Sequence, residues 1–114
     1  EAFRGCIGLT GDLNIPDNVT TLEESVFMGC TGFDGTLKIS ENLTVIPLGA
    51  FYQCSSLKGD IVIPDKVTEI GQSAFWRDEG FDGTLILGAN LKKIGNRAFW
   101  RCSNLKGEVT LRKL

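Results

Sequence analysis

The sequence contains no histidine, and among its 114 residues it has only three prolines, two tryptophans, one tyrosine and one methionine. Without imidazole the chain cannot form the Ser-His-Asp, Cys-His or histidine-zinc arrangements on which many hydrolases and zinc sites depend. An enzyme built from it would have to use carboxylates, lysines or thiols alone. The sequence therefore predicts a protein that is not an enzyme and has no catalytic, cofactor-binding or metal-binding residues.

Long apolar runs and a strong net charge are also missing. No stretch approaches the roughly 18 to 20 apolar residues of a membrane span, and the first ten residues lack the pattern of a secretion signal. A net charge of −2 argues against nucleic acid as a partner, although residues 1–57 are acidic overall and residues 58–114 are basic overall. We expect a chain that neither inserts into a membrane nor binds nucleic acid.

What the sequence does have is an internal repeat of 24 residues. Its most regular element is a phenylalanine that recurs at this spacing without exception, and glycine, cysteine and several aliphatic positions follow the same period. Residues 1–114 then form one domain of four full repeats and a partial fifth. The phenylalanine column is Phe3, Phe27, Phe51, Phe75 and Phe99, and the cysteine column is Cys6, Cys30, Cys54 and Cys102, with Asp78 in the remaining place.

Each repeat has a recognisable local pattern. In the third repeat, Ile61 and Ile63 are two positions apart, which predicts that both lie on one face of a short strand that Pro64 ends. Residues 67–71 read as a second extended piece, and residues 72–77 as a single helical or 3-10 turn. One such unit cannot bury its apolar side alone, so we expect stacked coils with parallel strands and right-handed crossovers, a repeat solenoid.

A glycine precedes the first strand of every repeat. This position predicts either a positive φ or a close approach that a Cβ would block. The column is Gly11, Gly35, Gly59, Gly83 and Gly107.

The repeat resembles the BspA-like, or spirochaete-type, leucine-rich repeat, whose pattern is a leucine, then I-x-I-P, V-T-x-I-G and A-F-x-x-C. The third repeat carries it as Leu57, Ile61, Ile63, Pro64, Val67, Thr68, Ile70, Gly71, Ala74 and Phe75, with Asp78 replacing the final cysteine. This resemblance implies a right-handed leucine-rich-repeat superhelix, extracellular or at the cell surface, mostly of bacteria that live with animal hosts. It also implies non-enzymatic, adhesion-type binding of matrix or host-cell proteins. A structural spacer that holds another domain away from the cell surface is the alternative.

The cysteine column predicts buried, reduced thiols, because side chains stacked about 5 Å apart with parallel Cβ vectors are poorly placed for disulfides. Asp78 interrupts this column. We expect its carboxylate to accept backbone N–H groups in a rearranged turn. A calcium site that uses Asp78 and Asp82 is the less favoured alternative, because the loop lacks ligands at the third and twelfth positions of an EF-hand.

Two surfaces are candidates for partner binding. The first is the position after the repeated phenylalanine, which holds Tyr52, Trp76 and Trp100 and should face away from the core. These rings could equally cover the turn of the next repeat. The second is the outer face of the strands, where Val62 and Ile86 would lie side by side.

The chain begins inside a turn and stops just after a strand position. We interpret it as a segment of a longer array. Head-to-tail self-association through ends that lack a polar cap is a further alternative.

Overall fold

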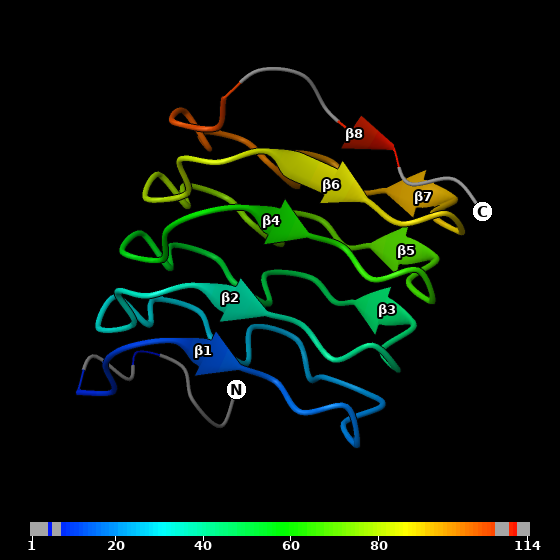
Figure 1. Cartoon of the computed structure of the whole chain (residues 1–114), viewed down its shortest axis with the longest axis horizontal. Coiled ribbons are helices and arrows are strands. Elements are labelled where there is room, and N and C mark those ends of the chain that lie inside the picture. Colours follow the sequence, from blue (N-terminus) through cyan, green and yellow to red (C-terminus); the bar gives the residue numbers. More distant parts are fainter. Residues whose placement is uncertain (1–4, 6–7, 107–109, 112–114) are drawn as a thin grey trace.

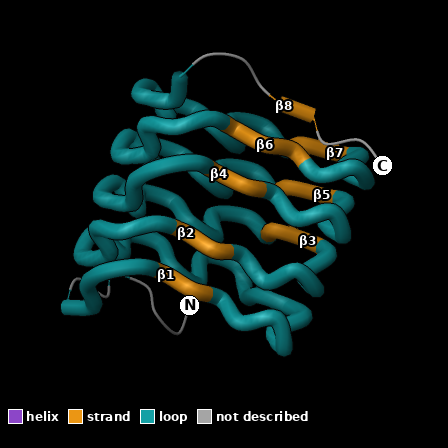
Figure 2. The backbone as a smooth tube through the Cα atoms, viewed as in Figure 1, coloured by secondary structure: helices purple, strands orange, loops and turns teal. Residues whose placement is uncertain are grey.

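The computed structural model describes residues 5, 8–106 and 110–111, and it is a stack of coils joined by short parallel strands. Figure 1 shows the stack from β1 (Leu13–Asn14) at one end to β8 (Thr110–Leu111) at the other. Strands make up little of each coil, and loops and turns make up the rest (Figure 2). The remaining strands are β2 (Leu37–Lys38), β3 (Val45–Ile46), β4 (Ile61–Val62), β5 (Glu69–Ile70), β6 (Leu85–Leu87) and β7 (Lys93–Ile94).

The strands form two rows along the stack, as Figure 1 shows. One row contains the pair β1-β2 and the sheet β4-β6-β8, and the other contains the sheet β3-β5-β7. Every pairing is parallel, and the partners differ by 24 residues, as in Leu13 with Leu37 and Val45 with Glu69. The sequence period is therefore the stacking register, and the predicted solenoid of short parallel strands is confirmed.

The core consists of columns in which each side chain lies on its equivalent in the next coil. The clearest column is a stack of phenylalanine rings, with centroids 5.7 Å apart between Phe27 and Phe51 and 5.1 Å apart between Phe51 and Phe75. Phe99 continues it at 5.2 Å from Phe75, whereas Phe3 lies outside the described residues. Offset ring pairs of this kind add about 0.5–1.5 kcal/mol each to the burial of the rings.

One aliphatic column does not stay buried along its length. Ile46 and Ile70 are fully buried, but Ile94, which follows them in the repeat, is 48 % exposed. Membership of the repeat column therefore does not by itself make Ile94 part of the core. Burial in a solenoid requires a coil on both sides, and among the described residues nothing packs over Ile94 as Ile94 packs over Ile70.

The segment expected to form a helical turn consists of consecutive tight turns. In the second repeat, the N–H of Met28 bonds the carbonyl of Ser25 at 3.1 Å, and that of Cys30 bonds the carbonyl of Phe27 at 3.1 Å. These are i→i−3 bonds of the 3-10 kind, but φ is positive at Ser25 and Gly29. A left-handed residue at every fourth position interrupts the helix, and the freed N–H groups bond the next coil instead.

The glycine that precedes the first strand of a coil serves two purposes at the four described positions, and Gly107 lies outside the described residues. In the odd repeats Gly11 and Gly59 have φ of 83°. In the even repeats a Cβ on Gly35 or Gly83 would collide with Asp12 or Asp60 of the coil below, whose backbone nitrogen it would approach to 2.9 Å. Both predicted reasons for glycine therefore occur, and they alternate from coil to coil.

Candidate binding surface

Tyr52, Trp76 and Trp100 form a continuous ladder of rings, which we call the aromatic ladder. The ring centroids of Tyr52 and Trp76 are 4.8 Å apart at an interplanar angle of 79°, and those of Trp76 and Trp100 are 5.1 Å apart at 67°. Edge-to-face contacts of this kind match the positive edge of one ring to the negative face of the next. The three residues predicted from separate repeats are thus brought together.

The rungs of the aromatic ladder differ in exposure. Tyr52 and Trp76 are half-buried, and the indole nitrogen of Trp76 is buried without a hydrogen-bond acceptor among the described residues. Trp100 is 42 % exposed. The inner rings are therefore partly covered, whereas Trp100 exposes a larger aromatic surface. The binding role of this column stays a prediction.

Arginines flank the exposed end of the aromatic ladder, a feature that the sequence analysis missed. The guanidinium carbon of Arg97 lies 5.3 Å from the centroid of the Trp100 ring, and that of Arg101 lies 4.9 Å from it. Arg77 occupies the place of Arg101 one coil below, and its N–H bonds the carbonyl of Trp100 at 2.8 Å. We call Arg77, Arg97, Trp100 and Arg101 the arginine–tryptophan edge.

All three arginines have left-handed backbones, with φ of 62° at Arg77, 58° at Arg97 and 62° at Arg101. The equivalent places in the other described coils also have positive φ, at Gly5, Gly29, Gly49, Ser25, Gln53 and Ser73. A residue other than glycine costs about 1–2 kcal/mol in this conformation. The left-handed turn is therefore a property of the repeat, and its glycines were the sequence signal for it.

The second predicted surface is less exposed than the sequence suggested. Val62 of β4 pairs directly with Ile86 of β6, so the two side chains lie side by side as expected. Both are half-buried. Polar neighbours share this face, since the carboxylate of Asp60 accepts the N–H of Thr84 at 2.8 Å. Val62 and Ile86 therefore present a smaller apolar area than a pair of fully exposed aliphatic residues would.

A groove of about 470 Å³ beside β3, β5 and β7 was not anticipated. Val45 and Leu48 are exposed along it, and Glu69 and Lys93 line it as well. Gly71 also lines it, and a Cβ there would come within 2.5 Å of the backbone nitrogen of Leu48. The close approach of the coils thus requires glycine at this place, where no side chain fills the groove. The glycine that recurs after isoleucine was the sequence signal for this groove.

Asp78 is fully buried in the place that cysteine occupies in the other coils. Its Oδ1 accepts the N–H of Cys54 at 2.7 Å, as the sequence analysis expected for this carboxylate, whereas Oδ2 has no partner among the described residues. Burial raises the pKa of Asp78 well above its usual value of 3.8, and the bond from Cys54 offsets this only in part. The buried group is therefore a neutral carboxylic acid over a wider pH range than an exposed aspartate.

The neighbouring cysteines are free thiols, as predicted for Cys30, Cys54 and Cys102, whereas Cys6 lies outside the described residues. The thiols of Cys54 and Cys102 each donate to a phenylalanine carbonyl 27 residues earlier, at 3.0 Å. Burial raises the pKa of both, that of Cys102 to about 12. These thiols thus remain protonated and pack as small core residues.

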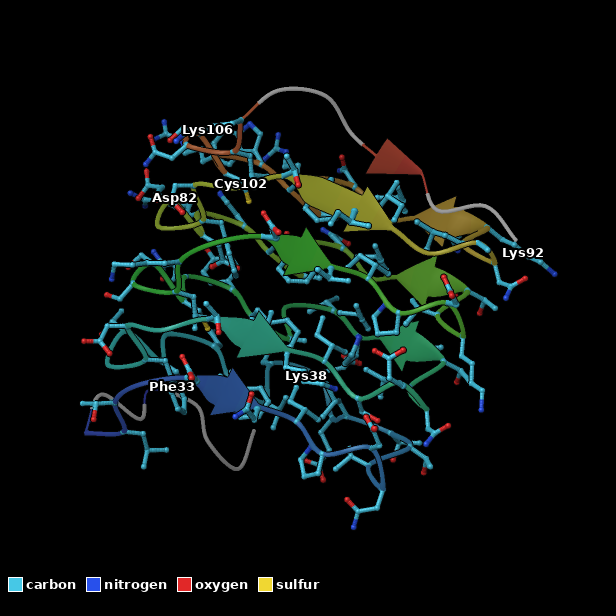
Figure 3. All side chains as sticks on the ribbon, viewed as in Figure 1. Phe33, Lys38, Asp82, Lys92, Cys102 and Lys106 are labelled. Carbon is cyan, nitrogen blue, oxygen red and sulfur yellow. The ribbon has the colours of Figure 1, made fainter. Side chains whose placement is uncertain are left out.

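The calcium alternative gains no support from the placement of its two aspartates. Asp82 is exposed and accepts the N–H of Gly59 at 2.9 Å, whereas Asp78 is inside the core. In Figure 3 Asp82 lies near Lys106 at one edge of the stack, and Lys92 lies at the opposite edge. No three histidine, cysteine or acidic side chains gather as a metal site within the described ranges. Those ranges also contain no helix with the length and apolar character of a membrane span.

Comparison with known sequences and structures agrees with this architecture. The sequence model described as "BspA type Leucine rich repeat region" matches residues 1–106 in six copies. The crystal structure of a T. pallidum leucine-rich-repeat protein is similar, with a TM-score of 0.81 and 33 % sequence identity. The match covers 91 % of this chain and 47 % of that one, so the chain spans about half the length of the matched structure. No curated protein matches the sequence.

Proposed function

Because the chain belongs to the BspA-type leucine-rich-repeat family, we propose that it is a non-enzymatic, adhesion-type protein-binding module of a surface or secreted protein. Repeats of this family are generally non-catalytic binding modules, usually on secreted or surface proteins. The partner we propose is an extracellular-matrix or host-cell surface protein. The aromatic ladder is the contact surface, and the half-buried pair of Val62 and Ile86 is the second candidate.

The observation that carries this choice of surface is the packing of Tyr52, Trp76 and Trp100 into one continuous ladder, with two guanidinium groups against the last ring. An indole held against a neighbouring ring can bury a large apolar area against a partner, and it loses little side-chain freedom on binding. Tryptophan and arginine are the residues most enriched among those that dominate protein interfaces. Trp100 has Arg97 and Arg101 against its ring, whereas Val62 and Ile86 offer a small aliphatic area beside threonine and aspartate.

Replacement of Trp100 by alanine is expected to weaken partner binding at least ~30-fold, the effect of losing about 2 kcal/mol at an interface centre. The fold should tolerate the change, because the side chain is exposed and contacts one other ring of the aromatic ladder. The measurement is capture of soluble proteins from an animal extracellular-matrix extract by the immobilised chain. Binding of the recovered protein is then quantified by calorimetry.

The matched control is Ile86→Thr on the outer face of β6, which should bind the partner as the original chain does. If Ile86→Thr loses partner binding and Trp100→Ala retains it, the contact surface is the outer face of the strands and not the aromatic ladder. If no protein is captured, the spacer alternative is favoured over a binding module. If both variants capture the same protein equally well, the contact lies on a third surface and the choice of the aromatic ladder is wrong.

A further inference from the structure

The arginine–tryptophan edge concentrates positive charge on a chain whose net charge is −2. Three of the chain's five arginines belong to it. Arg77 and Arg101 occupy the same place in successive coils, so their backbones are about 5 Å apart, the spacing of parallel strands. Successive coils therefore carry guanidinium groups from equivalent positions, and such a row of like charges favours an anion as its ligand.

Within the described residues the chain supplies no anion to these guanidinium groups. No carboxylate there forms an ion pair with Arg77, Arg97 or Arg101. Glu79 lines a hollow of about 300 Å³ together with Arg77, but no ion pair joins the two side chains. The guanidinium groups of Arg97 and Arg101 lie against the Trp100 ring, which orients them without neutralising them.

The backbone at these places does not itself require arginine. In the column of Arg77 and Arg101 the earlier coils carry Gly5, Gly29 and Gln53, all with positive φ, and glycine adopts this conformation without strain. The arginine side chains are thus a property of these coils and not of the turn.

We propose that the arginine–tryptophan edge binds an acidic segment of a polypeptide. This inference rests on the proposed function and specifies the chemistry of the partner. Aspartate or glutamate carboxylates accept paired hydrogen bonds from the fixed fork of a guanidinium group, and the exposed Trp100 ring takes up an apolar side chain between them. Nucleic acid fits less well, because its binding needs a longer basic surface than three arginines on an acidic molecule provide.

The test uses fluorescence anisotropy with labelled 12-residue peptides. One peptide has glutamates around a central leucine, and the other has lysine in place of every glutamate. The chain is expected to bind the glutamate peptide, to lose most of that binding between about 50 and 300 mM salt, and to leave the lysine peptide unbound. A single-stranded oligonucleotide and a heparin fragment serve as competing polyanions.

The decisive variant is the double change Arg77→Gly with Arg101→Gly, matched by Gln53→Gly in the same column, where φ is also positive at 58°. The double variant is expected to bind the glutamate peptide at least ~10-fold more weakly, with its unfolding temperature unchanged or raised because strain is relieved. Gln53→Gly is expected to bind as the original chain does.

The proposal is overturned if the glutamate peptide does not bind, if the lysine peptide binds equally well, or if the double variant retains full affinity. Tighter binding of the oligonucleotide or heparin fragment than of the glutamate peptide would also overturn it, in favour of a polyanion site. The acidic-segment proposal can fail while the proposed function stands. This is the case if capture of a matrix protein depends on Trp100 but not on the arginines or on the salt concentration.

Discussion

Replacing Phe75 with alanine is expected to lower the free energy of unfolding by about 3–5 kcal/mol. Phe75 is fully buried, and its ring stacks between those of Phe51 and Phe99, with Phe81 packed against it edge-to-face at 6.5 Å. Its removal opens a cavity in the middle of the stack, where the coils on both sides lose contacts. Urea unfolding followed by circular dichroism measures the loss.

Phe99→Ala is the matched control for Phe75→Ala. Phe99 belongs to the same column but is only partly buried, and Phe75 is its one ring partner among the described residues. We therefore expect a smaller loss, about half that of Phe75→Ala. Equal losses at the two positions would contradict the view that each coil is stabilised by its two neighbours.

The second large effect concerns the pH dependence of stability at Asp78. Its folded-state pKa lies well above 3.8, so the folded protein keeps a proton that the unfolded chain releases. The stability from this proton is fully present below pH 3.8, and it is lost as the pH rises through the folded-state pKa. Stability of the original chain relative to Asp78→Asn should therefore fall across this window, by up to about 1.4 kcal/mol per pH unit.

The asparagine variant isolates this effect because its amide does not titrate, while its oxygen can still accept the N–H of Cys54. Urea unfolding of both proteins at a series of pH values gives the difference directly. A difference that stays constant with pH would mean that Asp78 titrates normally. Asp78→Cys is expected to raise stability at neutral pH, since a thiol stays protonated there and restores the column.

Much of the fold could be predicted because one coil packs on the same residues of the next. That requirement makes the 24-residue spacing of Phe27, Phe51 and Phe75 both a sequence pattern and a ring stack. It also fixes the strand register, so that Val62 meets Ile86. The aromatic ladder followed from the same reasoning, because equivalent positions in successive coils must be neighbours.

What the repeat could not reveal is where one coil differs from the next. The sign of φ at Arg97 depends on the turn, and arginine itself gives no indication of a left-handed backbone. Ile94 has the same sequence environment as the buried Ile70, yet its exposure depends on what packs above it. The groove runs beside Gly71, where the coils approach so closely that a side chain would collide with Leu48. Periodicity alone does not show how closely two coils approach.

The two tryptophans of the chain, Trp76 and Trp100, both belong to the aromatic ladder, so intrinsic tryptophan fluorescence reports from the proposed contact surface alone. The most direct test of this surface is a fluorescence titration with the captured partner, run beside calorimetry. If the aromatic ladder binds, the emission shifts to shorter wavelength as Trp100 is buried, and the change saturates with the calorimetric affinity. Heat of binding without any change in tryptophan emission would contradict the account, because the partner would then occupy another face.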